Sequence, residues 1–188
     1  VFVNGILVGT HAGGFDPFFF DITDALIEEV EQEIIVSVTD PTDTGNQPVG
    51  KQTLNPFAIQ YTAVAGIWQT VWLEPVPVSC IERSTTVTNI AESSVSVRSH
   101  ISNASDTMSV IFTCSVNGLV LTQTESPIKQ GQTETVLNIS DLRLWCPSDP
   151  FLYDLQLQLI DSSGEVVDVV DSYFGAREIT CEPDRSGH

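Results

Sequence analysis

The chain has 188 residues, of which 41% are hydrophobic, enough to bury the core of one large or two small domains. Its 25 acidic and 7 basic residues give a formal net charge of −18, which disfavours binding to nucleic acid phosphates or to an anionic membrane surface. No apolar run approaches the roughly 20 residues that a membrane-spanning helix needs. Valine, isoleucine, threonine and serine dominate the composition, which favours β-structure throughout.

The start of the chain is predicted to form short β-strands with tight turns. In VFVNGILVG, Asn4-Gly5 lies between two alternating segments, and this pair is the strongest short signal for a β-hairpin. DITDAL at residues 21–26 predicts one helical turn, with Asp21 or Thr23 as its N-cap.

A strand, a long loop and another strand are predicted next. Residues 33–40 indicate a strand, and residues 41–56 are so rich in glycine, proline and asparagine that they indicate a loop. A loop of this length in a compact domain is usually functional or mobile. In GIWQTVWLEP at residues 66–75 the side chains alternate with period two, which predicts a strand with Trp68 and Trp72 together on a core-facing side.

A domain boundary is predicted at Pro75-Val76-Pro77, because proline cannot donate to a β-ladder. Beyond it, residues 77–180 contain about seven short strands with turn signals every 8–12 residues, the spacing of an immunoglobulin-like sandwich. The clearest strand is predicted at residues 152–160, where Tyr153, Leu155, Leu157 and Leu159 point one way. Other strands are predicted at residues 94–100, 108–116 and 165–174, with a hairpin turn at Ser162-Ser163-Gly164.

The chain has four cysteines, all from residue 80 onward, and none belongs to a C-x-x-C pair, which argues against a zinc site or a thioredoxin-like motif. The first and last strands of an immunoglobulin-like sandwich can be neighbours, so the preferred disulfide is Cys80–Cys181. A Cys114–Cys146 disulfide is the second choice. Either bridge requires its two Cα atoms to lie within about 7 Å of each other. Four buried free thiols remain the alternative.

Several features favour a secreted, extracellular protein. Asn103-Ala104-Ser105 and Asn138-Ile139-Ser140 have the form of N-glycosylation sequons. The even number of cysteines and the high acidity point the same way. No signal peptide is visible, and the chain starts at VFVNG without a methionine, so we expect it to begin inside a longer protein.

The stretch GIWQTVWLEP closely resembles the last strand of the sugar-binding domain of glycoside hydrolase family 2, which includes β-galactosidases, β-glucuronidases and β-mannosidases. Four further stretches resemble blocks of the same family, in the family's order. They are VFVNGILVGTHAGGFDPFFFDITDAL at residues 1–26, QPVGKQ at 47–52, LWCPSDPFLYDL at 144–155 and SYFGAREI at 172–179.

The resemblance implies an all-β chain with two domains and a tail. Residues 1–76 would be a partial jelly-roll (galactose-binding-like) sugar-binding domain, residues 77–180 an immunoglobulin-like β-sandwich, and residues 181–188 a tail. In the family the two catalytic glutamates, about 5 Å apart in a retaining enzyme, sit on a (β/α)8 barrel of roughly 250 residues. Neither the barrel nor these glutamates has a counterpart here, so we expect a non-catalytic scaffold or sugar-binding fragment that hydrolyses nothing alone.

This reading also implies the partners. The parent enzyme would bind a carbohydrate, and the missing barrel and N-terminal strands would come from the same protein or from a partner chain. No cofactor or metal is expected, because the three histidines are dispersed without metal-ligand spacing. Two other functional classes stay open: an independent carbohydrate-binding module, and a structural or adhesive cell-surface β-sandwich protein.

The candidate substrate-contact residues precede the GIWQTVWLEP strand. In several family members a residue six positions before the glycine that corresponds to Gly66, often an aspartate, reaches over the barrel mouth to the sugar. Gln60 holds that place here, followed by Tyr61. An amide can bond sugar hydroxyls as donor and acceptor, although it supplies no negative charge. Lys51 and Gln52 are further candidates for facing the substrate cleft. For all four, packing in the core or between domains is the alternative.

Overall fold

The computed structural model describes residues 1–28 and 30–179, and it confirms the predicted all-β class. The contacts divide the chain into two units, Val1–Leu73 and Glu74–His188. The division falls immediately before Pro75-Val76-Pro77, the stretch whose prolines indicate a boundary.

The first unit begins with a small antiparallel sheet of order β2-β1-β3. Its strands are β1 (Phe2–Val3), β2 (Ile6–Leu7) and β3 (Ile34–Ile35). Asn4 and Gly5 connect β1 to β2 with φ angles of 49° and 80°. Both angles are positive, as a two-residue type I′ turn requires, so the hairpin predicted from Asn-Gly is confirmed.

Asn4 also fixes the segment that follows the hairpin. Its side-chain amide donates to Ala25 O (2.8 Å) and to Gln32 Oε1 (2.7 Å), while its Oδ1 accepts from the Glu33 N–H (2.9 Å). An asparagine tolerates the left-handed conformation and provides both a donor and an acceptor. One residue therefore shapes the turn and anchors two later stretches to it.

The predicted helical turn is a short 3-10 helix, η1 (Thr23–Ala25). Its N-cap position is Ile22, which has no side-chain cap, so neither Asp21 nor Thr23 is the N-cap. Instead, Asp21 Oδ1 accepts from the Thr23 N–H (2.9 Å) and hydroxyl (2.7 Å), an Asx turn placed just before the helix. These hydrogen bonds lower the pKa of Asp21.

The prediction of a strand at residues 66–75 is wrong, because the structure has no paired strand there. Trp68 and Trp72 are 66% and 70% exposed rather than buried. A period-two pattern produces a strand only where a neighbouring strand provides hydrogen-bond partners, and none of the described strands lies alongside this stretch. The strand predicted at residues 33–40 is likewise reduced to the two residues of β3.

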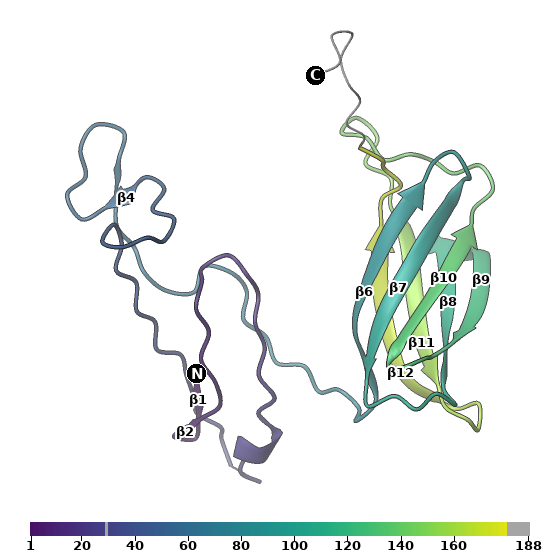
Figure 1. The fold of residues 1–188 in the computed structure, drawn as a ribbon, viewed down its shortest axis with the longest axis horizontal. Helices are drawn as coiled ribbons and strands as arrows, with labels where there is room; N and C mark the ends of the chain where they lie inside the picture. The colour runs from purple at the N-terminus through teal and green to yellow at the C-terminus, as the bar shows by residue number, and fades with distance from the viewer. Residues whose placement is uncertain (29, 180–188) are drawn as a thin grey trace. The chain divides into compact units, whose positions relative to one another are not determined.

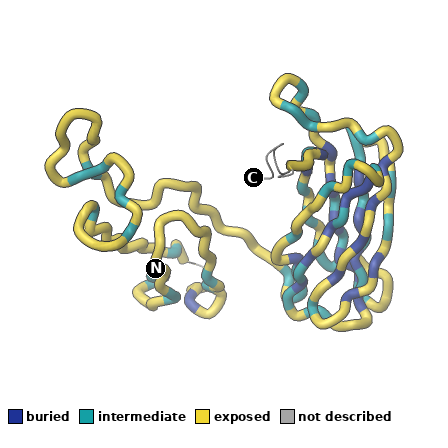
Figure 2. Tube along the Cα trace, turned by 45° about the horizontal axis from the view of Figure 1, so that its top comes forward, coloured by how far each residue is buried: buried dark blue, intermediate teal, exposed yellow. Residues whose placement is uncertain are grey.

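Apolar side chains of the first unit are mostly open to solvent. Val3 and Ala25 are its buried hydrophobic residues among those described, whereas Phe15, Phe19 and Phe57 are each largely exposed. Figure 2 shows residues of this unit as predominantly exposed along the trace. The described part of the unit is therefore held mainly by hydrogen bonds in its turns and loops.

The second unit is a β-sandwich, and the prediction of seven strands is confirmed for its described residues (Figure 1). One sheet has the order β10-β7-β6 and the other β12-β11-β8-β9. Neighbouring strands in both sheets pair antiparallel. The strands are β6 (Cys80–Asn89), β7 (Ser94–Ser102), β8 (Ser109–Val116), β9 (Leu119–Pro127), β10 (Gln132–Asn138), β11 (Tyr153–Ile160) and β12 (Val166–Phe174).

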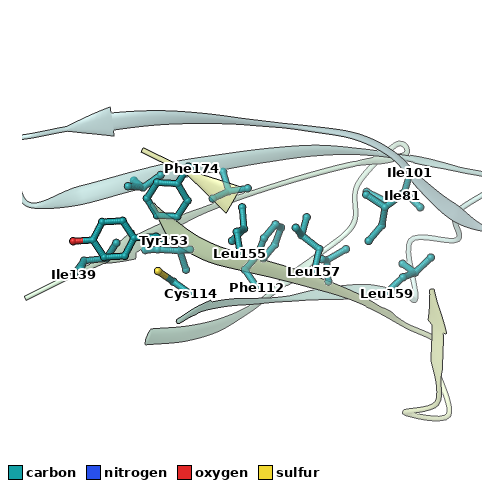
Figure 3. Packing of buried hydrophobic residues seen from close by; sticks show 14 of the residues in the cluster. Ile81, Ile101, Phe112, Cys114, Ile139, Tyr153, Leu155, Leu157, Leu159 and Phe174 are labelled. Carbon is teal, nitrogen blue, oxygen red and sulfur yellow. The ribbon is translucent and has the colours of Figure 1, made fainter. Parts of the chain in front are cut away.

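The core of the sandwich lies between the two sheets (Figure 3). The alternation predicted for residues 152–160 is confirmed, since every second side chain of β11 from Tyr153 to Leu159 is buried. The opposite sheet contributes further buried residues, among them Val97 and Leu137, and Phe112 is buried on the adjacent strand β8. Close packing of these side chains is the main source of stability of this unit.

Tyr153 connects the core to the loop before β11. Its hydroxyl accepts a hydrogen bond from the Arg143 N–H at 2.6 Å. Its ring stacks on Phe174, with centroids 5.2 Å apart, and meets Phe151 edge-on at 5.0 Å. This hydrogen bond ties the start of β11 to the backbone ten residues upstream.

The first and last strands of the sandwich, β6 and β12, lie close together although they belong to different sheets. The Ile81 N–H donates to Asp168 Oδ2 at 2.8 Å, joining the two edges. A β-bulge interrupts the β6–β7 ladder beside Ile81, and bulges commonly redirect a strand at a sheet edge.

Candidate functional site

The structure brings the four predicted substrate-contact residues together, although they come from two separate stretches of the sequence. Strand β4 (Gln52–Thr53) pairs in parallel with β5 (Tyr61–Thr62), so that Gln52 lies opposite Tyr61. The Tyr61 N–H also donates to Lys51 O at 2.7 Å. We refer to Lys51, Gln52, Gln60 and Tyr61 as the loop cluster.

Side chains of the loop cluster are held partly by local hydrogen bonds. Gln52 Oε1 accepts from the Val64 N–H (2.7 Å), and Gln60 Oε1 accepts from the Phe57 N–H (3.1 Å). The amide oxygens thus order the loop, while neither amide NH2 group has a hydrogen-bond acceptor among the described residues. These two NH2 groups are available to donate to a ligand.

Within the loop cluster, the Lys51 ammonium lies over the aromatic ring of Tyr61. The Lys51 ammonium lies 5.6 Å from the centre of the Tyr61 ring, a cation–π distance. Tyr61 is 62% exposed, so its ring and hydroxyl face solvent. An exposed aromatic ring beside hydrogen-bond donors is suited to a sugar, whose CH face can stack while its hydroxyls are bonded.

The loop that carries the cluster has its own internal support. Asp43 Oδ2 accepts from the Leu54 N–H (3.1 Å), and Asp40 Oδ1 accepts from the Thr42 N–H (2.7 Å). Gln47 Nε2 donates to Thr42 O at 2.9 Å. Such side chain-to-backbone bonds stabilise a long loop without a core. The loop cluster itself consists of an amine, two amides and a phenol, and it contains no carboxyl group.

A concave feature lies at one end of the sandwich, where the LWCPSDPFLY stretch meets the end of β12. The Trp145 N–H donates to Ala176 O (2.9 Å), and the Arg177 guanidinium lies 5.1 Å from the centre of the Trp145 ring. A Cβ atom on Gly175 would lie 3.1 Å from that ring, so glycine permits the close approach. A cavity of about 280 Å³ opens here, lined by Ile90, Leu144, Trp145, Cys146, Pro147, Ala176, Arg177 and Glu178.

The thiols differ in environment, and the Cys114–Cys146 disulfide of the sequence reading is absent. Cys114 points into the core, as Figure 3 shows, and burial raises its pKa to about 11. Cys146 lies in the loop before β11, where a hydrogen bond with the Ser148 hydroxyl lowers its pKa. The Cys114 thiol on β8 therefore faces the core and is not directed toward the Cys146 thiol in the loop.

The preferred disulfide, Cys80–Cys181, involves a residue outside the described part of the chain. Cys80 is half-buried at the start of β6 and has no disulfide partner among the described residues. Desolvation raises its pKa, and the nearby Asp168 and Glu82 carboxylates raise it further.

The two sequons lie in different surroundings. Asn103 is exposed in a turn with φ of 49°, and its side-chain amide already donates to Val78 O at 2.9 Å. Asn138 ends β10 and is exposed on the outer face of its sheet, with buried neighbours Leu137 and Ile139 on the inner face.

One polar group was missed by the sequence reasoning. Arg143 forms two hydrogen bonds to Asp149, of 2.6 and 2.9 Å, and its guanidinium lies 4.2 Å from the centre of the Phe151 ring. The hydrogen bonds lower the pKa of Asp149. No sequence signal pairs these residues, because the turn at Cys146–Asp149 brings them together.

Two negative findings apply to residues 1–28 and 30–179. No helix there is long and apolar enough to cross a membrane. Among the same residues, no three histidine, cysteine, aspartate or glutamate side chains gather in a way that could hold a metal ion.

Relatives of known name align along nearly the entire chain. A β-galactosidase of Thermoanaerobacter pseudethanolicus is 29% identical over 192 aligned positions, which cover 98% of this chain and 25% of the relative. A β-glucuronidase of Paenibacillus borealis is 26% identical over 98% of this chain and 32% of its own length. The chain thus spans about a quarter to a third of the length of these two relatives.

A solved structure shares the fold. The β-glucuronidase of Bifidobacterium dentium, complexed with coumarin-3-O-glucuronide, superposes with a TM-score of 0.64 at 21% identity, over 97% of this chain and 35% of that one. The sequence pattern described as glycosyl hydrolases family 2 matches residues 81–177, from the second residue of β6 to just beyond β12. This match extends over more than half of the chain and over the whole sandwich, and the chain therefore belongs to glycosyl hydrolases family 2.

Proposed function

We propose that the chain forms two supporting β-domains of a larger retaining β-glycoside hydrolase and is not itself catalytic. The observation that carries this proposal is the family match across the sandwich, in a chain that covers only 25% of its β-galactosidase relative. The remaining, larger part of such an enzyme has room for a (β/α)8 barrel of roughly 250 residues with its two catalytic carboxyl groups. That barrel would belong to the same protein or to a partner chain, and the whole would be secreted.

Within such an enzyme we assign the loop cluster to sugar positioning, and residues 1–76 to a partial jelly-roll sugar-binding domain. Gln52 and Gln60 have free NH2 donors, and Tyr61 exposes its ring beside the Lys51 ammonium. These groups bond hydroxyls and stack on a ring, and a donor to a sugar hydroxyl contributes about 0.5–1.5 kcal/mol.

The first experiment tests whether the chain is non-catalytic. The purified 188-residue chain is incubated with nitrophenyl β-galactoside, β-glucuronide and β-mannoside, and no turnover is expected. Turnover that a substitution within residues 1–188 abolishes would overturn the proposal.

The intact mass of the natural protein provides a second test. A barrel added to these domains predicts a mass of roughly 60–100 kDa. A natural protein of only these 188 residues would contradict the proposal.

The second experiment tests the loop cluster in the natural protein. Gln60→Ala and Tyr61→Ala are expected to lower kcat/KM about two- to tenfold, mainly through KM, because each removes one sugar contact. Gln132→Ala is the matched control, an exposed amide on the sandwich that should leave both constants unchanged. Unchanged kinetics for the cluster variants would refute the positioning role and leave the supporting role intact.

A further inference from the structure

The outer face of the four-stranded sheet carries an ordered array of polar side chains. The register of β12, β11, β8 and β9 aligns one side chain from each strand in successive rows across the sheet. The inner face of the same strands is buried core, so the residues of these rows all face outward. We call this surface the polar face; its rows are Tyr173–Asp154–Ser115–Val120, Asp171–Gln156–Thr113–Gln123 and Val169–Gln158–Ile111–Glu125.

Hydrogen bonds within β11 and between neighbouring strands hold the amides of the polar face in place. Gln156 Nε2 donates to Asp171 Oδ1 (2.8 Å), and Gln158 Nε2 donates to Gln156 Oε1 (3.1 Å). Gln123 Nε2 donates to Thr113 Oγ1 at 2.8 Å. The orientation of each amide is thereby set before any ligand arrives, which reduces the entropy lost on binding. Gln158 Oε1 and Gln123 Oε1 accept no hydrogen bond from the described residues and can accept from a ligand.

Tyr173 adds an aromatic surface at one end of the first row. It is 69% exposed, whereas its neighbour Phe174 is buried on the opposite face. Tyr173 lies directly across from Asp154 and two residues after Asp171, so its ring stands beside the hydrogen-bonded amides. Its ring packs against no other aromatic ring among the described residues. A ring left open beside fixed amides offers both stacking and hydrogen bonding to one ligand.

The charges of the polar face restrict its partner. The three rows contain Asp154, Asp171 and Glu125 but no lysine or arginine, on a chain of formal charge −18. Phosphates and acidic sugars are repelled by such a surface. A second copy meeting the same face across a two-fold axis would set these carboxylates against one another. Neutral hydroxyl groups, in contrast, bond amides, carboxylates and threonine without a charge penalty.

We propose that the polar face binds a neutral oligosaccharide in extended form, with a sugar ring against Tyr173 and hydroxyls on the amides of Gln156 and Gln158. Four strands spaced about 4.8 Å apart give a surface about 14 Å across, which has room for more than one sugar unit. This binding surface lies on the sandwich, is separate from the loop cluster and does not depend on the proposed enzymatic role. It would attach the protein to a glycan without contributing to hydrolysis.

The test uses the full chain and defined probes. β-1,4-linked hexamers of glucose, xylose, mannose and galactose are titrated into isotope-labelled protein, with a galacturonate hexamer as the acidic comparison. At least one neutral hexamer is expected to bind at millimolar concentration or below and to shift the side-chain NH2 resonances of Gln156 and Gln158. The galacturonate hexamer is expected to shift neither.

Two variants and one control separate the ring from the fold. Tyr173→Ala is expected to weaken binding about two- to tenfold, the range for a lost aromatic contact, while Tyr173→Phe binds as the native protein does. Val136→Ala, an exposed change on the other sheet, should have no effect. Absence of shifts with every neutral hexamer, shifts confined to the loop cluster, equal binding of galacturonate, or sugar-free dimerisation that Tyr173→Ala abolishes would each overturn the proposal.

Discussion

The hydroxyl of Tyr153 offers a sharp test of how the sandwich is held. It accepts from the Arg143 N–H at 2.6 Å, and the tyrosine is 2% exposed. Tyr153→Phe keeps the ring contacts with Phe151 and Phe174 but leaves that half-buried N–H without its acceptor. Water can reach a half-buried donor, so the loss is the net contribution of one hydrogen bond, and we expect the free energy of unfolding to fall by about 1 kcal/mol.

Urea unfolding followed by far-ultraviolet circular dichroism measures this change. With a slope of about 1–3 kcal/mol per molar urea, a loss of about 1 kcal/mol lowers the midpoint by about 0.3–1 M. Tyr173→Phe is the matched control, because its exposed hydroxyl has no hydrogen-bond partner among the described side chains, and we expect a change below about 0.5 kcal/mol. A Tyr153→Phe protein that unfolds within about 0.5 kcal/mol of the native protein would refute the assigned role.

Four further predictions concern the sandwich. At pH 8, iodoacetamide should modify Cys146 in the native protein but Cys114 only on unfolding, as peptide mass spectrometry would reveal; equal rates would contradict the burial. The pKa of Cys114 rises from 9.0 to about 11 on folding, so the stability that its neutral thiol contributes is complete below pH 9 and lost as pH rises toward 11, which a pH series of urea midpoints tests. Gly175→Ala should cost about 1–2 kcal/mol by pressing a methyl group against Trp145, and an unchanged urea midpoint would show that the ring can move. Asp168→Ala should lower the free energy of unfolding by about 1–2 kcal/mol, because it removes the acceptor of the Ile81 N–H. Asp168→Asn keeps a side-chain oxygen as acceptor and should lose much less stability, so equal losses for the two variants would contradict this role.

The sandwich was predictable because its pattern and its environment agree. The alternation through Tyr153, Leu155 and Leu157 predicts one buried side, and the sheet that it faces provides that burial. The Asn4-Gly5 hairpin was predictable for a different reason, since its turn chemistry is local and needs no distant partner. A strand or turn can be predicted from sequence when the residues that stabilise it lie within the same hairpin or within the same pair of facing sheets.

The stretch at residues 66–75 shows where such reading ends. Its alternation is as regular as that of β11, yet Trp68 and Trp72 are exposed and no described strand pairs with it. Trp68 instead donates its indole N–H to Gly14 O at 2.7 Å, with its ring edge-on to Phe15. A period-two sequence specifies which side chains share a face of the strand. Whether the strand forms depends on another segment lying beside it to provide hydrogen-bond partners.

Candidate-site residues were found from a family resemblance, but their grouping came from the fold. Nothing in the sequence states that Lys51 and Gln52 lie beside Tyr61; the parallel pairing of β4 with β5 places them there. The polar face could not be predicted from the sequence for a similar reason. Its rows combine residues from four strands, and their alignment depends on register across three ladders, including the bulge between Cys114 and Ser115.

Stability and ligand chemistry are assigned to different parts of this chain, and that separation makes the proposals testable. The loop cluster is supported by side chain-to-backbone bonds such as those of Asp43 and Gln47, not by the sandwich core. Its exposed side chains, like Tyr173 on the polar face, contribute little to folding, so their replacement should alter binding while the urea midpoint stays constant. Tyr153 should behave in the opposite way. If Tyr173→Ala or Tyr61→Ala lowered stability as much as Tyr153→Phe, a loss of sugar binding would report unfolding, and the assignment of separate roles would fail.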